Sequence, residues 1–194
     1  MLLLSKHFSM IIDSVEYPGI NPDNTLRKFA TPKPTLDVCI AAANGDLSTL
    51  ESKEERGLGE VDEHGNTALI WAADKGHVDV VKFILQKDIT WMINHRGYLG
   101  NTAIARAARG GHASTMEALL SHPLADPNIC NDKMQYPLHF AAFKKHPEMV
   151  QIMLQSGKCD TMVKDRKGRT PAEDTSVDQI RNSILQYRTN KTST

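Results

Sequence analysis

Hydrophobic and polar positions recur in blocks along this chain. Three stretches align without gaps: TALIWAADKGH at 67–77, TAIARAARGGH at 102–112 and YPLHFAAFKKH at 136–146. Behind each lies a second stretch with apolar residues at helical spacing: VDVVKFIL at 78–85, ASTMEALL at 113–120 and PEMVQIML at 147–154. Each block therefore predicts two short helices in succession.

The blocks repeat with a nearly constant period. The three starts fall 35 and 34 residues apart, a further copy begins at Leu36, and a truncated one begins at Thr170. One helix pair of this size cannot bury its apolar face alone, so such units stack side by side and the end units differ. The charged stretch STLESKEER in the first unit and the degenerate last unit are the polar caps that stacking predicts.

Residues at the predicted helix ends support this interpretation. A threonine precedes the first helix as an N-cap, proline occupies the first helical position, and glycine offers a left-handed C-cap. The residues are Thr67, Thr102 and Thr170 for the N-caps, Pro137 and Pro171 for the prolines, and Gly76 and Gly111 for the C-caps. The first helices also carry paired alanines, whose small side chains let neighbouring helices approach closely.

Residues 36–188 resemble the ankyrin-repeat family. That family's pattern is TPLHxAAxxGH, a following VVxxLL helix and an exposed β-turn finger. The resemblance implies an all-α fold, an ankyrin-repeat solenoid of about four and a half stacked helix-turn-helix units. It also implies a non-enzymatic module that holds a protein partner on its concave face, the surface formed by the fingers and the first helices.

The fourth unit departs from the family pattern at two positions. Tyr136 replaces the capping threonine and Lys145 replaces the left-handed glycine. The lost cap and the strained backbone should each cost about 1 kcal/mol. We therefore expect the fourth unit to open more easily than the second.

The repeats divide the chain into three parts. Residues 1–34 form a non-repeat N-terminal arm and linker, 35–188 the ankyrin domain, and 189–194 a flexible tail. Within the domain the predicted units lie near 35–65, 66–100, 101–134 and 135–168, with a C-terminal cap at 169–188. The arm either covers the first repeat, which we favour, or anchors the chain on a partner.

Composition narrows the classes of function. The 23 basic and 23 acidic residues balance, which disfavours a dedicated nucleic-acid binder. No apolar run approaches the roughly 18 residues of a membrane span. The three cysteines are far apart and form no CxxC pair, which favours a reducing, intracellular and most simply cytoplasmic location. Import into an organelle stays open as an alternative.

The sequence predicts no catalytic residue, metal site or cofactor. It contains no nucleophile elbow, phosphate-binding loop or HExxH pair. His77, His112 and His146 follow the turn in equivalent places, so the repeat architecture explains them. Catalysis or metal binding would show itself as an ion or cofactor in the purified protein.

Side chains on the predicted fingers and at the ends of the first helices form the candidate partner-binding surface. Tyr98, Met134 and Phe143 have the chemistry of interface anchors, and arginine is enriched at the energetic centres of interfaces. Arg106 stands where the family commonly has a half-buried leucine. We expect Trp91 to pack under its loop, with a partner pocket as the alternative. The full candidate set is His64, Asp74, Lys75, Tyr98, Arg106, Arg109, Met134, Phe143 and Lys144.

Charge is distributed unevenly along the repeats. Residues 35–65 carry eight acids against two basic residues, a net charge of −6, and residues 136–194 carry +4. This polarity either serves solubility or orients a partner. The sequence thus predicts an adaptor or scaffold that binds one protein partner, as a monomer or within a complex. The alternative is a permanent structural or assembly subunit of a larger complex, anchored partly by the N-terminal arm.

Overall fold

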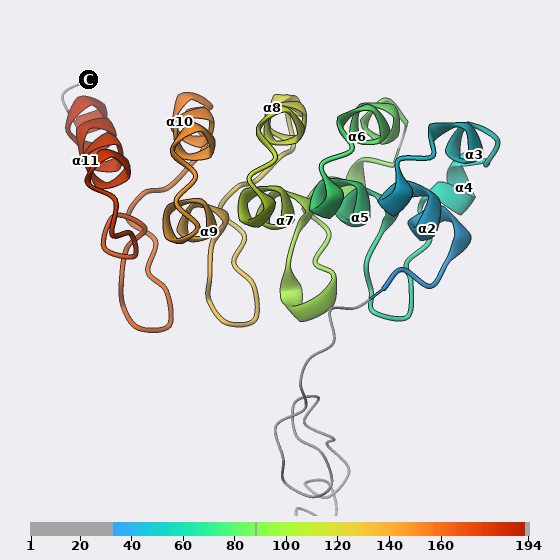
Figure 1. Cartoon of the computed structure of the whole chain (residues 1–194), viewed down its shortest axis with the longest axis horizontal. Coiled ribbons are helices and arrows are strands. Elements are labelled where there is room, and N and C mark those ends of the chain that lie inside the picture. The colour runs from blue at the N-terminus through green and yellow to red at the C-terminus, as the bar shows by residue number, and fades with distance from the viewer. Residues whose placement is uncertain (1–32, 88, 193–194) are drawn as a thin grey trace, which may run out of the picture. The chain divides into compact units, whose positions relative to one another are not determined.

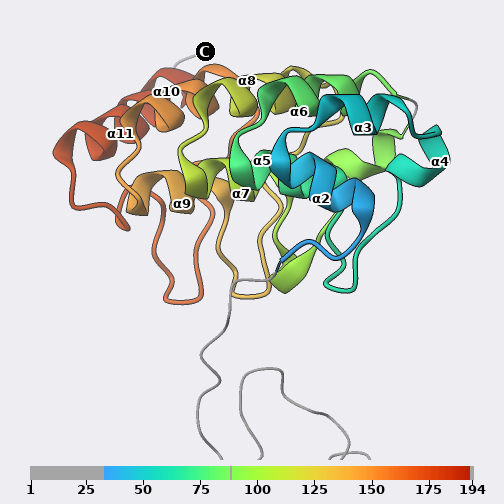
Figure 2. The ribbon, with the colours of Figure 1, turned by 45° about the vertical axis from the view of Figure 1, so that its right-hand side comes forward.

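The computed structural model describes residues 33–87 and 89–192, and their helices stack in two rows (Figure 1). The first helices of the units are α2 (Asp37–Asn44), α5 (Ala68–Lys75), α7 (Ala103–Gly110) and α9 (Pro137–Phe143). The second helices are α3 (Leu47–Glu51), α6 (Val78–Leu85), α8 (Ala113–Ser121) and α10 (Pro147–Gln155). Figure 2 shows the two rows running side by side, with the loops projecting from the row of first helices. The predicted all-α solenoid is confirmed.

Helix ends follow the predicted chemistry in the second and third units. The Thr67 hydroxyl accepts the N–H of Ile70 at 3.3 Å, and the Thr102 hydroxyl accepts the N–H of Ala105 at 3.2 Å. After both helices the chain turns through a glycine with φ near +75°, at Gly76 and Gly111. Such a conformation strains any residue with a Cβ atom, so glycine allows the sharp return into the second helix.

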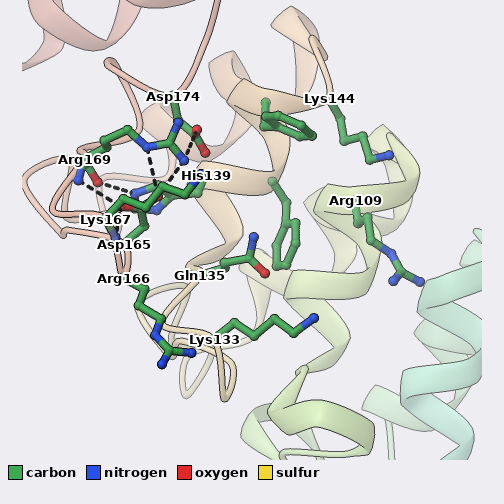
Figure 3. A pocket seen from close by; sticks show the side chains of 12 residues that line it. Arg109, Lys133, Gln135, His139, Lys144, Asp165, Arg166, Lys167, Arg169 and Asp174 are labelled. Carbon is green, nitrogen blue, oxygen red and sulfur yellow. Dashed lines mark hydrogen bonds and ion pairs between the residues drawn. The ribbon is translucent and has the colours of Figure 1, made fainter. Parts of the chain in front are cut away.

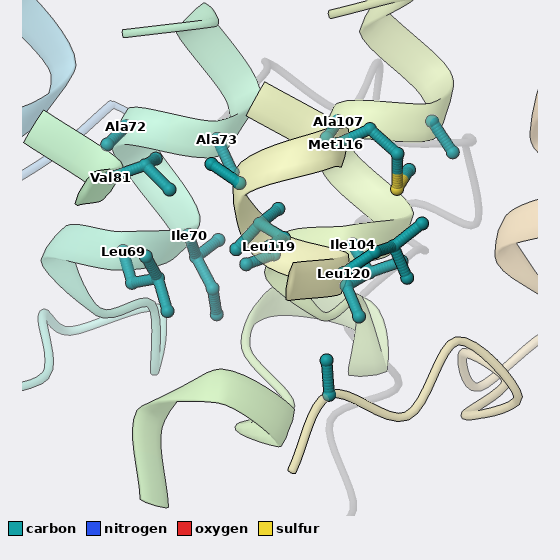
Figure 4. Close-up of a cluster of buried hydrophobic side chains, with 14 of the residues drawn as sticks. Leu69, Ile70, Ala72, Ala73, Val81, Ile104, Ala107, Met116, Leu119 and Leu120 are labelled. Carbon is teal, nitrogen blue, oxygen red and sulfur yellow. The ribbon is translucent and has the colours of Figure 1, made fainter. Parts of the chain in front are cut away.

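The core lies between the two rows and between neighbouring units (Figure 4). The paired alanines of α5, α7 and α9 are fully buried, as the close approach of neighbouring first helices requires. Larger residues of both rows fill the remaining space, among them Leu69, Ile104, Met116 and Leu119, which are all inaccessible to solvent. Each unit therefore depends on its neighbours for burial of its apolar side chains.

Four β-turn fingers project beside the first helices, at residues 62–66, 97–101, 131–135 and 165–169. The same backbone bond closes each one, for example from Asp62 N to Asn66 O at 2.9 Å and from Asp165 N to Arg169 O at 2.9 Å. The fourth finger position has positive φ in all four and holds glycine in three of them. In the 131–135 finger it holds Met134, with φ of +56°.

Side chains from one unit also fasten the loop of the next. The Asn94 amide donates to Leu124 O at 2.7 Å and accepts the N–H of Asp126 at 3.0 Å. One repeat later, Asn128 makes the equivalent pair of bonds to Lys158 O and Asp160 N. These two asparagines form an inter-repeat clasp that sequence inspection did not single out.

The fourth unit shows both predicted departures. Tyr136 makes no side-chain hydrogen bond at the start of α9. Lys145 takes the left-handed conformation with φ of +63°, one residue beyond Lys144, the C-cap residue of α9. Whether this unit opens first stays a prediction.

The ends of the domain differ from expectation in three places. The second helix of the first unit is split into α3 and α4 (Glu55–Leu58). Thr170 and Pro171 begin a turn at 171–174 instead of a helix, and the Thr170 hydroxyl donates to the Glu173 carboxylate at 2.9 Å. The final helix, α11 (Asp178–Thr192), continues through most of the expected flexible tail. Residues 1–32 of the predicted N-terminal arm lie outside the described residues.

Candidate protein-binding surface

The predicted side chains of the second and third units meet around Asp74, at the end of α5. Its carboxylate lies 2.9 Å from the Arg109 guanidinium, 3.3 Å from that of Arg106 and 3.3 Å from the Lys75 ammonium. Burial raises the pKa of Asp74, but the three cations outweigh it, so the pKa stays below its ordinary value. This cluster joins α5 to α7 and carries a net positive charge.

Arg106 is not part of an exposed surface, and this corrects the sequence prediction. Only 5% of the residue is accessible, because α7 turns its side chain toward α5 and the Asp74 carboxylate. Burial, followed by the charge of Arg109, lowers the pKa of Arg106, and the attraction of Asp74 opposes both. Asp74 is the ion-pair partner that sequence inspection missed, and it allows an arginine to occupy this buried position.

His64 and Tyr98 come together on neighbouring fingers. Their rings meet edge to face, with centroids 5.8 Å apart, and both side chains are half-buried. The backbone N–H of Tyr98 donates to the Asn66 side chain at 2.9 Å, which fixes the 97–101 finger against the preceding one. Gly97 allows this approach, because a Cβ atom there would lie 2.4 Å from the same oxygen. Tyr98 therefore supports the fingers and is not a fully exposed anchor.

The remaining predicted residues lie toward the C-terminal half. Phe143 and Lys144 are exposed at the end of α9, and they line a cavity of about 420 Å³ with Arg109. Met134 is also exposed, at the tip of the 131–135 finger, but does not line this cavity. We call the cavity the basic pocket. Its other lining residues are Lys133, Gln135, His139, Phe140, Asp165, Arg166, Lys167, Arg169 and Asp174.

The basic pocket has two chemically different sides. Figure 3 shows Lys133, Lys144 and Arg109 extending to one side, while Arg169, Asp165 and Asp174 gather on the other. Arg169 lies 2.8 Å from the carboxylates of Asp165 and Asp174, so both acids in the pocket are paired internally. His139 lies 2.9 Å from the carbonyl oxygen of Arg169 and connects this cluster to α9.

Four cations of the basic pocket have no ion-pair partner among residues 33–87 and 89–192. They are Lys133, Lys144, Arg166 and Lys167, and all are exposed. Lys133 and Lys167 occupy equivalent finger positions 34 residues apart. That spacing was the available sequence signal. What the sequence did not reveal is that α9 brings both lysines to one hollow with Phe143 and Lys144.

Trp91 also contradicts its expectation. It is 49% exposed and meets the His95 ring edge to face, with centroids 5.2 Å apart. The short helix η1 (Thr90–Asn94) buries the neighbours Met92 and Ile93 instead, which leaves Trp91 on the outside of the loop.

The repeat-equivalent histidines have structural contacts. His77 and His112 each lie 3.0 Å from a carbonyl oxygen of the preceding unit, at Ala43 and Asp74. The described residues contain no group of three His, Cys, Asp or Glu side chains able to hold a metal ion.

Burial raises the pKa of the Cys39 thiol to about 12, and the nearby Asp62 charge adds to the shift. Nor does any described helix have the length and apolar character needed to cross a membrane.

Comparison with known proteins follows the same repeats. The family model described as "Ankyrin repeats (3 copies)" matches residues 38–129 and 106–185. The chain is 32% identical over 61% of its length to an Arabidopsis thaliana protein named "Putative E3 ubiquitin-protein ligase XBAT31", covering 28% of that protein. It is 25% identical over 94% of its length to human BCL-6 corepressor-like protein 1, covering 11% of it.

Another relative belongs to a different class. The chain is 34% identical over 49% of its length to the human transient receptor potential cation channel subfamily A member 1, covering 8% of it. The chain therefore covers no more than 28% of the length of any of these three relatives. On the match of the family model over most of the domain, the chain belongs to the ankyrin-repeat family.

Proposed function

We propose that this protein is a non-enzymatic adaptor or scaffold that binds a protein partner through the concave face of its repeats. Ankyrin repeats support a role in protein–protein interaction. The finer assignment rests on one observation: Phe143, at the end of a first helix, is 59% exposed beside a hollow whose lining includes four cations with no ion-pair partner in the described part of the chain. An exposed aromatic side chain within a charged rim is typical of an interface anchor.

The strained finger supports the same surface. Met134 holds a left-handed conformation that glycine would adopt without strain, and it leaves its side chain 48% exposed. Backbone strain persists where the surrounding structure imposes it and is often associated with function. An exposed apolar side chain on a strained backbone is better suited to a contact with a partner than to the packing of the domain.

The names of the relatives agree with a binding role for the shared segment. They describe a ligase, a corepressor-like protein and a cation channel, which have no single reaction in common. We infer that the region of this chain similar to these relatives binds a protein and that this chain is not an enzyme. We also propose an intracellular location, on the cysteine usage described above.

Affinity isolation tests this proposal. The tagged full chain is compared with two double variants. Met134→Ser/Phe143→Ser changes the concave face. Lys82→Ser/Leu185→Ser changes two exposed residues of α6 and α11, which we call the outer helices together with α10. We expect one protein to be captured by the wild type and the outer-helix variant but lost from the concave-face variant. Equal capture by all three would contradict binding through this face. Capture at fixed stoichiometry that resists salt would favour the permanent-subunit alternative.

A further inference from the structure

We propose that the basic pocket binds an acidic segment of the protein partner, rich in aspartate and glutamate, that inserts one apolar side chain beside Phe143. This inference rests on the proposed function and adds the chemistry of the partner. It draws on three properties of the pocket: the charges left unpaired, the apolar wall and the size of the hollow.

The unpaired charges select an anion. The two acids in the pocket are both held by Arg169, so they do not neutralise the remaining cations. Arg109 shares its single carboxylate, Asp74, with two other cations. Lys133, Lys144, Arg166 and Lys167 add four charges without an ion-pair partner among the described residues. Carboxylates of a bound segment would supply the missing partners and lower the mutual repulsion of these side chains.

The apolar wall selects a peptide over a uniformly charged ligand. Phe143 is exposed and Phe140 is half-buried, and both line the hollow between the cations. Burying the exposed part of a phenyl ring against an aliphatic or aromatic side chain removes apolar surface from water. The pocket is thus suited to a segment in which acidic residues flank an apolar one.

The size and position of the pocket favour a short segment. A hollow of about 420 Å³ takes a few side chains, whereas a folded domain would need a wider surface. An extended nucleic acid would carry its phosphates beyond the pocket, and the chain as a whole has no excess of basic residues to neutralise them. A local cation cluster within a chain of zero net charge therefore favours an acidic peptide over a polyanion.

The experiment uses fluorescence anisotropy with the full chain. The probes are labelled peptides that alternate Asp or Glu with Leu or Phe, and matched peptides in which Asn and Gln replace the acids. The variants are Lys133→Glu/Lys144→Glu, Phe143→Ser, and the control Lys53→Glu/Lys82→Glu, which changes the net charge equally on exposed residues outside the pocket. Circular dichroism verifies that each variant is folded.

We expect acidic peptides to bind at least about tenfold more tightly than their amide counterparts. Lys133→Glu/Lys144→Glu should lose that preference, whereas Phe143→Ser should weaken the acidic and the amide peptides alike. The control should keep both the preference and the affinity. The inference is overturned if the amide peptides bind equally well, if the control loses as much affinity as the pocket variants, or if a uridine oligonucleotide binds more tightly. Occupation of the pocket by the acidic first unit of a second copy, seen as dimerisation that the acidic peptides do not reverse, would also overturn it.

A negative result here is distinguishable from failure of the proposed function. If no acidic peptide binds but the affinity isolation still yields a partner that depends on Met134 and Phe143, only the acidic chemistry is wrong. If the concave-face variant captures the partner as well as the wild type does, the function proposed for that face is wrong as well.

Discussion

The guanidinium of Arg106 lies 3.3 Å from the carboxylate of Asp74, which belongs to the preceding repeat. Both side chains are largely removed from solvent, with 6% and 15% of each accessible. Arg106 occupies an interior position of α7 that an aliphatic side chain would fill without any partner. The stacking of the second and third units therefore depends on a charged contact as well as on apolar packing.

Replacing Asp74 with asparagine should destabilise the domain by about 3 kcal/mol, because the buried Arg106 charge loses its partner. Urea unfolding followed by circular dichroism measures the change. The control is Asp79→Asn at the exposed start of α6, which should cost less than about 1 kcal/mol. A loss for Asp74→Asn as small as that of the control would show that Arg106 does not need the carboxylate.

The ion pair of Asp74 and Arg106 also makes the stability of the domain depend on pH. The pKa of Asp74 in the folded state is lower than its ordinary value of about 4, so its stabilisation is fully present above pH 4. It is lost as the pH falls through the folded value. The stability difference between wild type and Asp74→Asn should therefore be constant near neutral pH and shrink below pH 4. A difference that grows on acidification would contradict this assignment.

Glycine substitutions at two adjacent lysines, Lys144 and Lys145, distinguish the effect of backbone strain from the other effects of introducing a glycine. Lys145→Gly should raise the free energy of unfolding by about 1 kcal/mol, because φ is +63° there. Lys144→Gly, at φ of −76°, should lower it by about 0.5–1 kcal/mol through the greater entropy of the unfolded chain. Equal effects of the two substitutions in urea unfolding would exclude strain as the cause.

The inter-repeat asparagine clasp should be worth about 1–2 kcal/mol, since Asn128→Ala removes two hydrogen bonds and leaves two backbone groups without that partner. Native-state hydrogen exchange should show faster exchange at Asp160 N–H. Asn182→Ala, on the exposed surface of α11, is the matched control and should change stability little. Unchanged protection of Asp160 would mean that water replaces the clasp.

Gly76→Ala should destabilise the protein by more than about 1 kcal/mol, because φ is +78° and the new Cβ atom would lie 2.5 Å from the His112 ring. Gly57→Ala is the contrasting change: nothing lies within 4 Å of that Cβ position, and alanine favours the helix there. Thermal unfolding should move the two variants in opposite directions. A Gly76→Ala variant as stable as wild type would refute the steric argument.

Much of the fold was predictable because capping residues and apolar spacing within each unit determine where its helices begin and end. The second helix α6 spans the same residues, 78–85, as the apolar stretch that predicted it. Thr67 and Gly76 mark the ends of α5 through interactions confined to a few neighbouring residues. Local capping and periodicity can be read from a sequence without knowledge of the tertiary structure.

The errors concern contacts between units. Arg106 seemed suited to the surface because Asp74, its partner, lies 32 residues away in the sequence. Trp91 seemed suited to the core because apolar periodicity cannot show which side of a short irregular helix faces out. The basic pocket was missed as a unit for the same reason: the lysines of the fingers and the phenylalanine of α9 meet only when the repeats stack.

The most direct measurement of the central claim is site-specific photo-cross-linking in source cells. A photoreactive residue replaces Phe143 or Met134 on the concave face, or Lys82 or Gln151 on the outer helices. Binding through the concave face predicts one cross-linked protein from the first two positions and none from the other two. Cross-links from Lys82 and Gln151, with none from Phe143 and Met134, would contradict it.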